Sequence, residues 1–316
     1  MPLTPQPRRS ADSRTGFLAG VAAYAFWGLL PLYFPLLAGA GVWEIGAHRV
    51  VWSLVFCAAL LGLTGGFAQV ATLLRDRRAV LGLTVATVFL AANWVTFLYA
   101  VLTDRVVDAA LGYFINPIVT VLLAVLVLRE RLRKGQWAAI GVAGVGVVVI
   151  TIGHGTLPWI SVVLAACFGL YGLAKNRIGR TVPALPGLLV ETGVLTPVAL
   201  GFIMVLAAGG TGSFLADTDV LGHPWHSLAL VGSGVATAVP LLFFAVAHRN
   251  LPLSTVGLLQ FITPIMQFIV GVTIFAEQMP PSRWAGFALV WVALIILGAD
   301  GYRARRRGQP GLPASP

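Results

Sequence analysis

The feature that most constrains this chain is an internal repeat with a fixed offset of 147 residues. Sliding the sequence against itself by that offset aligns identical residues in pairs: Glu44 with Glu191, Phe97 with Phe244, Phe114 with Phe261, Pro117 with Pro264, Glu130 with Glu277 and Trp137 with Trp284. Because one offset holds from Glu44 to Trp137, we expect the two halves to be copies of one structural unit.

The repeat unit is long enough and apolar enough to predict five membrane-spanning helices. The chain is 58% hydrophobic and only 10% charged, with a mean hydropathy of +0.89, whereas soluble domains carry about 25% charged residues. Its 316 residues hold roughly ten spans of about 20 residues each. Since five is an odd number, two copies must cross the lipid bilayer in opposite senses, as in many secondary transporters.

The predicted fold is therefore an all-α membrane protein of ten transmembrane helices arranged as two inverted five-helix repeats. Repeat 1 is expected over 16–152 and repeat 2 over 157–299, between a cytoplasmic segment over 1–15 and a basic, disordered cytoplasmic tail over 300–316. The apolar runs place the helices at 16–38, 43–63, 80–102, 109–128, 136–152, 157–175, 186–208, 227–248, 254–275 and 283–299.

The basic residues predict that both termini are cytoplasmic. With the N-terminus inside, eighteen of the 21 Lys and Arg residues lie on the cytoplasmic side, only Arg105 and Arg283 lie outside, and Arg49 lies near a membrane face. The eighteen are Arg8, Arg9, Arg14, Arg75, Arg77, Arg78, Arg129, Arg131, Arg133, Lys134, Lys175, Arg177, Arg180, Arg249, Arg303, Arg305, Arg306 and Arg307. The net charge of +10 is thus interpreted as an orientation signal for insertion, and no nucleic-acid partner is expected.

Cofactor chemistry is not indicated by the sequence. Cys57 and Cys167 both lie in apolar runs without ligand spacing, so neither a metal site nor a disulfide is predicted. No nucleotide-binding loop or nucleophile elbow occurs, so pumping by ATP and enzymatic activity are not expected, and no cofactor is expected. The sequence indicates no oligomeric state.

A charged cluster opens the second predicted span. Glu44 and His48 are four residues apart and share a helix face, while Arg49 is rotated by a further 100° or so. Together they could bind an anionic or zwitterionic solute, or form a gate that responds to protons through His48. The alternative is an interfacial cluster whose side chains reach the membrane surface and anchor the helix end.

Glu191, the repeat counterpart of Glu44, is the fourth candidate for gating or coupling. Inversion places it near the cytoplasmic end of its helix, so a carboxylate at each mouth would suit alternating access. The alternative is a structural role in which Glu191 caps its helix and pairs with Lys175 or Arg177.

Polar side chains in the middle of predicted spans are the candidates for binding a small-molecule substrate, because such groups usually face a cavity or each other. The principal candidates are Asn93, Trp94, Tyr113, Asn116 and Gln260. Trp27, Tyr171 and Gln267 are further candidates for lining the same cavity, although aromatic residues in membranes also serve in packing. In the alternative interpretation, Asn116 and Gln260 only hold neighbouring helices together.

Prolines interrupt the spans at related positions and favour a central site. Pro117 and Pro264 are repeat counterparts, and Pro240 is the counterpart of Asn93. A proline inside a span frees a carbonyl group and kinks the helix, which is tolerated where neighbours or a cavity satisfy the backbone. Kinks in both copies therefore predict a binding site where the two repeats meet.

The motifs that carry these residues resemble those of the RarD-type members of the EamA family, within the drug/metabolite transporter superfamily. They are AYAFWG at 23–28, EIGAHR at 44–49 followed by Trp52-Ser53, Asn93-Trp94, LGYFINP at 111–117 and LLQFITP at 258–264. The resemblance runs from about Thr15 to Tyr302 and implies two EamA repeats, a multi-pass protein of the bacterial inner membrane and a permease role. The sequence departs from the family pattern at Leu102–Val106, Phe261 and Thr263, near the inferred cavity.

The sequence therefore predicts a secondary transporter that exports small polar or amphipathic metabolites or drugs by alternating access, with proton coupling as one possible energy source. The family name is linked to chloramphenicol sensitivity, and the resemblance supplies no substrate. Two rival interpretations are a membrane scaffold or sensor without transport, and a membrane enzyme that acts on lipid. A polar cavity that water can reach, between the repeats, would favour transport over both, whereas a fully packed core would argue against transport.

Overall fold

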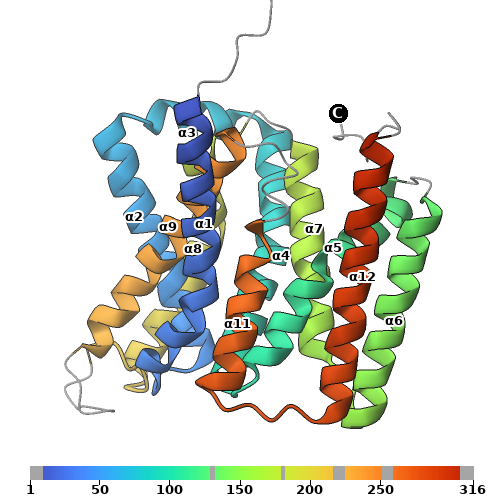
Figure 1. Ribbon diagram of the computed structural model, residues 1–316. Coiled ribbons are helices and arrows are strands. Elements are labelled where there is room, and N and C mark those ends of the chain that lie inside the picture. The colour runs from blue at the N-terminus through green and yellow to red at the C-terminus, as the bar shows by residue number, and fades with distance from the viewer. Residues whose placement is uncertain (1–9, 129–131, 179–181, 216–224, 251–258, 307–316) are drawn as a thin grey trace, which may run out of the picture.

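The computed structural model describes residues 10–128, 132–178, 182–215, 225–250 and 259–306, which form eleven α-helices and one 3-10 helix gathered in a single bundle (Figure 1). The helices are α1 (Ser10–Tyr33), η1 (Phe34–Leu37), α2 (Val42–Thr64), α3 (Phe67–Arg75), α4 (Arg77–Leu102), α5 (Val106–Leu128), α6 (Lys134–His154), α7 (Trp159–Ile178), α8 (Ala184–Ala208), α9 (His226–Asn250), α11 (Ile262–Thr273) and α12 (Pro281–Arg306).

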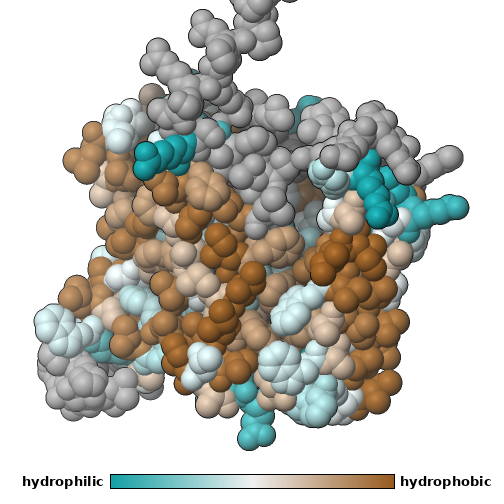
Figure 2. Space-filling view, viewed as in Figure 1, coloured by the Kyte–Doolittle hydropathy of each residue, from teal (hydrophilic) through white to brown (hydrophobic). Residues whose placement is uncertain are grey.

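The regular structure in the described residues is entirely helical. Seven of the described helices are long and apolar enough to cross a membrane, and three shorter apolar helical stretches lie at Val106–Thr120, Trp159–Ala174 and Ile262–Thr273. Each of the ten predicted spans overlaps one of these segments. On the face shown in Figure 2, hydrophobic side chains form a broad band, and hydrophilic ones gather toward its upper and lower edges. The first turn of α1 and the last turn of α12 lie at the same, upper end of the bundle (Figure 1).

One helix that the sequence did not predict is α3, which connects α2 to α4. It has nine residues, too few to cross a membrane, and buries Val70 and Leu73 against Leu61 and Leu83. The connection then ends at Asp76, whose carboxylate accepts hydrogen bonds from the backbone N–H groups of residues 78 and 79 and so caps α4.

The two halves of the chain interleave. Extensive helix contacts join α1 to α9, α4 to α7, α2 to α8 and α6 to α12, each pairing one helix from either half. The 147-residue offset converts α1 into α7 and α4 into α9, so the first two contacts are counterparts of each other. The contact of α5 with α7 and the contact of α11 with α1 are counterparts in the same sense.

Close approach of α2 and α9 depends on a glycine. A β-carbon added at Gly234 would lie 2.3 Å from the backbone carbonyl carbon of Trp52, and Ser53 Oγ donates a hydrogen bond of 3.1 Å to the Gly234 carbonyl oxygen. Small residues allow helices to approach closely in membranes. This contact fixes the register of α2 against α9, and with it the position of Arg49.

The structure corrects one predicted helix. Residues 251–258 lie outside the described part of the chain, but Leu259 is helical, Gln260 and Phe261 form a turn, and α11 begins only at Ile262. Pro264, in the first turn of α11, has no N–H group to bond the carbonyl oxygen of Gln260, which explains the interruption. Pro117 and Pro240 instead lie within the uninterrupted helices α5 and α9.

Candidate functional site

Arg49 lies at the centre of the polar interior. It is seven residues from the start of α2, about 10 Å along the helix axis, and only 3% of its surface is exposed. Its Nε donates a hydrogen bond of 2.9 Å to Thr237 Oγ1 on α9. Its guanidinium carbon lies 5.3 Å from the centroid of the Phe34 ring and 4.9 Å from that of Trp94. The guanidinium is therefore held between two aromatic rings, well inside the bundle.

Asn93 and Tyr113 form the adjoining part of the site. Tyr113 on α5 donates a hydrogen bond of 3.2 Å to Asn93 Oδ1 on α4, and Asn93 Nδ2 donates one of 3.2 Å to the Leu164 carbonyl oxygen on α7. The Tyr113 ring packs edge-on against Phe97 and Phe168. Asn93 thus links three helices, while Tyr113 and Trp94 keep part of their surface exposed.

Two buried amide groups lie on the two helices that carry the counterpart prolines. Asn116 on α5 and Gln267 on α11 are 8% and 1% exposed. Gln267 Nε2 donates a hydrogen bond of 3.2 Å to the Trp27 carbonyl oxygen. Asn116 Oδ1 and Gln267 Oε1, however, accept no hydrogen bond from the described residues. Each oxygen is therefore left with unused capacity to accept a hydrogen bond from a ligand.

Glu44 and His48 bind the α8–α9 connection rather than Arg49. Glu44 Oε1 accepts hydrogen bonds of 2.7 Å from the backbone N–H of Ser213 and of 3.0 Å from its hydroxyl group. The His48 ring stacks on Phe214 at 4.8 Å and accepts a hydrogen bond from Trp52 Nε1. His226 Nε2 also contacts the Ser213 hydroxyl at 2.8 Å. These contacts hold the described part of the connection against the end of α2.

Glu191 is the buried carboxylate in the middle of the other half of the chain. It is 2% exposed and lies seven residues after the start of α8. It is close enough to Tyr171 for their charges to interact. The side chains of Lys175 and Arg177, the pairing partners considered above, are not among those that the structure describes.

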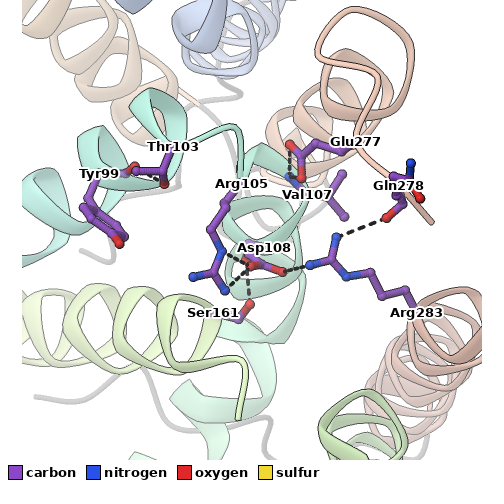
Figure 3. Close-up of polar contacts among 9 residues, drawn as sticks. All are labelled: Tyr99, Thr103, Arg105, Val107, Asp108, Ser161, Glu277, Gln278 and Arg283. Carbon is purple, nitrogen blue, oxygen red and sulfur yellow. Dashed lines mark hydrogen bonds and ion pairs between the residues drawn. The ribbon is translucent and has the colours of Figure 1, made fainter. Parts of the chain in front are cut away.

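A second charged cluster joins the start of α5 to the start of α12 (Figure 3). Asp108 accepts a hydrogen bond of 2.8 Å from Arg105 Nε and forms an ion pair of 3.3 Å with Arg283 Nη2. Ser161 on α7 donates to the Asp108 carbonyl oxygen at 2.6 Å. The two arginines that the charge count placed outside are thus the two that pair with Asp108.

Glu277 completes this corner of the molecule. Its carboxylate accepts hydrogen bonds of 2.9 and 3.2 Å from the backbone N–H of Val107 and so caps the start of α5. Burial raises the pKa of Glu277 to about 7, against the opposing effect of the backbone N–H groups of Val107 and Val106. A surface pocket of about 600 Å³ lies beside Glu277, Asp104 and Arg283.

The structure sorts the predicted residues into groups. It brings Arg49 to Trp94, Asn93 to Tyr113, Gln267 to Trp27 and Tyr171 to Glu191. It separates Glu44 from Arg49, and Arg49 forms no ion pair with any described carboxylate. Gln260 lies in the turn before α11. Among the described residues, no group of three or more His, Cys, Asp and Glu side chains is placed to hold a metal ion.

Phe34, Thr237 and Asp108 are among the partners in these clusters that the sequence did not predict. Phe34 and Thr237 reach Arg49 from distant parts of the sequence, and no local motif marks either residue. Asp108 did carry a signal, because it is an acidic residue next to an apolar run and three residues from Arg105. The predicted span began at 109 and so left Asp108 in the preceding loop.

The central polar side chains are enclosed in this conformation. Arg49, Asn93, Asn116 and Gln267 are each less than 9% exposed, so these groups do not line a cavity that is open to water. The open cavity predicted between the repeats is therefore not seen around them.

Comparison with known proteins identifies the family. Residues 14–152 match the model of the EamA-like transporter family. The chain is 46% identical to Protein RarD of Streptomyces exfoliatus, over 96% of this chain and 94% of the relative, and 39% identical to an uncharacterized transporter of Pseudomonas aeruginosa, over 96% and 99%. A solved crystal structure shares the fold with a TM-score of 0.57 and 17% identity, over 90% of this chain and 97% of that one. The chain therefore belongs to the EamA family of membrane transporters, as a RarD-type member of the drug/metabolite transporter superfamily.

Proposed function

We propose that this protein is a secondary transporter that exports a small polar or amphipathic metabolite or drug by alternating access. Membership of a transporter family supports transport in general. The site proposed for the substrate lies among Arg49, Asn93, Tyr113, Asn116 and Gln267, where helices of the two halves meet.

The observation that carries this proposal is the unused hydrogen-bonding capacity of Asn116 and Gln267. Both amide oxygens are buried without a partner among the described residues, and a buried polar group without a partner costs about 1–3 kcal/mol. They lie on α5 and α11, which contact each other, and the chain turns at 260–261 just before α11. Interrupted helices at the repeat interface are typical of substrate sites in secondary transporters.

Alternating access requires that the contacts at one end of the bundle break while those at the other form. Two sets of contacts close the end at which α5 and α12 begin: Glu44 with Ser213, and Asp108 with Arg283. Opening toward that side would have to release at least one set. We propose Glu191, beside Tyr171, and His48 as candidates for coupling to protons, because both are buried and ionisable.

We place both termini in the cytoplasm and the protein in the inner membrane of a bacterium, with inverted repeats at 16–152 and 157–299. The distribution of basic residues supports this orientation. The contacts of α1 with α9 and α11 match those of α7 with α4 and α5, which supports the repeat.

The proposal is tested by counterflow in proteoliposomes over amino acids, nucleosides and amphenicols, with and without a pH gradient. We expect at least one class to be transported, and the variants Asn116→Leu and Gln267→Leu to lose most of that flux. The matched control is Gln69→Leu, because Gln69 is exposed on α3. Wild-type flux in both variants would refute the site. Absence of flux for every class in folded protein would instead favour a scaffold or sensor.

A further inference from the structure

The inference concerns the part of the Arg49 guanidinium that binds no protein group. Arg49 Nε is bonded to Thr237, but Nη1 is buried and has no hydrogen-bond partner. No ion pair joins Arg49 to any described carboxylate, since Glu44 instead binds Ser213. Arg49 therefore carries a positive charge inside the bundle and has an N–H donor group that binds no described acceptor.

Such an arrangement is unfavourable unless something else completes it. A buried charge without a counter-charge costs several kcal/mol, and cation–π contacts with Phe34 and Trp94, which return about 2 kcal/mol or more each when desolvated, offset only part of that cost. The interfacial anchor considered from the sequence does not fit either. An anchoring side chain keeps its charged end in water, and Arg49 is only 3% exposed.

The surroundings specify what could bind. A guanidinium presents paired N–H groups in one plane, which matches the two oxygens of a carboxylate. The residues that contact the guanidinium, Phe34, Trp94 and Thr237, add no second positive charge. One cation suits a monoanion better than a phosphate dianion. The partly exposed faces of Trp94 and Tyr113, with Phe97 and Phe168 behind Tyr113, provide an apolar wall for the rest of the ligand.

We propose that Arg49 binds the carboxylate of a small organic acid with an aromatic or apolar body, and that this acid is the substrate class of the transporter. The identification of this acid as a substrate rests on the proposed transport function, but the binding of its carboxylate by Arg49 does not. The site belongs to one half of the chain only, because the repeat counterparts of Arg49 and Trp94 are Thr196 and Leu241.

Binding is measured by calorimetry on the purified full chain in detergent, with benzoate as the probe. Benzamide has nearly the same shape without the charge, and benzylamine reverses the charge. We expect benzoate to bind at least tenfold more tightly than benzamide, and benzylamine more weakly than both. Equal affinity for benzoate and benzamide, or no binding of benzoate, would overturn the proposal.

Three variants assign the binding to Arg49. Arg49→Met should remove the preference for benzoate over benzamide, and Arg49→Lys should weaken benzoate binding about tenfold, because an ammonium lacks the planar pair of donors. Arg78→Met is the matched control, since Arg78 is exposed at the start of α4. Persistence of the preference in folded Arg49→Met would refute the assignment. Size-exclusion chromatography checks folding, and Arg49→Lys supplies a second test if Arg49→Met does not fold.

Counterflow separates this inference from the proposed function. Flux of uridine or chloramphenicol without flux of benzoate would overturn the substrate class and leave the transport proposal standing. Binding of benzoate that depends on Arg49, without flux of any solute, would support the carboxylate site and contradict transport.

Discussion

Two buried arginines, Arg49 in the first half of the chain and Arg283 in the second, have opposite surroundings. Arg283 forms an ion pair with Asp108, which also binds Arg105, whereas Arg49 is enclosed by two aromatic rings and a threonine and binds no described carboxylate. An arginine that the protein neutralises itself serves to hold helices together. One that the protein leaves charged is available to a ligand. The comparison therefore separates a structural cluster at Arg283 from the binding site proposed at Arg49.

The largest expected effect comes from breaking the neutralised cluster. Asp108→Asn leaves Arg283, which is 8% exposed, without its counter-charge, and removal of one partner from a buried ion pair costs about 3–5 kcal/mol. We expect a loss of that size in the free energy of unfolding in mixed micelles. Adding Arg283→Met to Asp108→Asn should recover part of it, because the unpaired charge is then gone. A loss under about 1 kcal/mol would show that the cluster is not structural.

The second effect tests how rigidly the Arg49 site is held. In Gly234→Ala the new methyl group meets the backbone at Trp52, so α9 must move away from α2, at a cost of about 1–3 kcal/mol. That movement also draws Thr237 away from Arg49, so benzoate affinity should fall. Gly141→Ala is the control, because a β-carbon there meets nothing within 4 Å. Equal thermal stability of the two variants would contradict the tight contact.

A smaller effect is expected from pH at Glu277, beside the neutralised cluster. Its pKa of about 7 lies above the ordinary value of 4.5, so between these values the folded protein holds a proton that the unfolded chain releases. Stability should therefore decrease as pH rises from 4.5 through 7. Because Glu277 is partly exposed, solvent screening limits the change to about 1 kcal/mol or less.

The variant Glu277→Gln should flatten this pH dependence, measured as the unfolding midpoint between pH 4.5 and 8. Asp104→Asn is the control on the same pocket, because Asp104 is exposed. An unchanged slope in Glu277→Gln would assign the titration to another group.

The smallest effect on stability is expected at Arg49 itself. Arg49→Met removes an unpaired charge together with its cation–π contacts, and these changes oppose each other. We expect the free energy of unfolding to stay within about 1 kcal/mol of the wild type. A loss as large as that of Asp108→Asn would mean that Arg49 is structural, and the contrast between the two arginines would fail.

Much of the fold was readable from the sequence because the repeat and the apolar runs act over long stretches. Each predicted span overlaps a helix, although boundaries moved by several residues at α5 and α12. The helix α3 was missed because nine amphipathic residues between two spans produce no long apolar run. The turn at 260–261 was visible only as Pro264, which indicates a disturbance but does not say whether the helix bends or stops.

The site was predicted less completely for a physical reason. Spacing within one helix indicated that Arg49 lies off the face shared by Glu44 and His48, and the structure separates their partners accordingly. Which groups meet Arg49 depends on how α2 sits against α9, and Thr237 lies 188 residues away in the chain. That register is determined by contacts such as the one at Gly234, which a single sequence does not reveal.

The unneutralised charge of Arg49 has a consequence for the energy source. If a carboxylate is the cargo, the loaded site is electrically neutral and the empty site carries one positive charge, so each export cycle moves one negative charge out of the cell. A membrane potential that is negative inside favours that movement by about 2.3 kcal/mol per 100 mV. A carrier built in this way can be driven by voltage alone, without using a proton gradient. Export by reconstituted protein would then respond to a potassium diffusion potential.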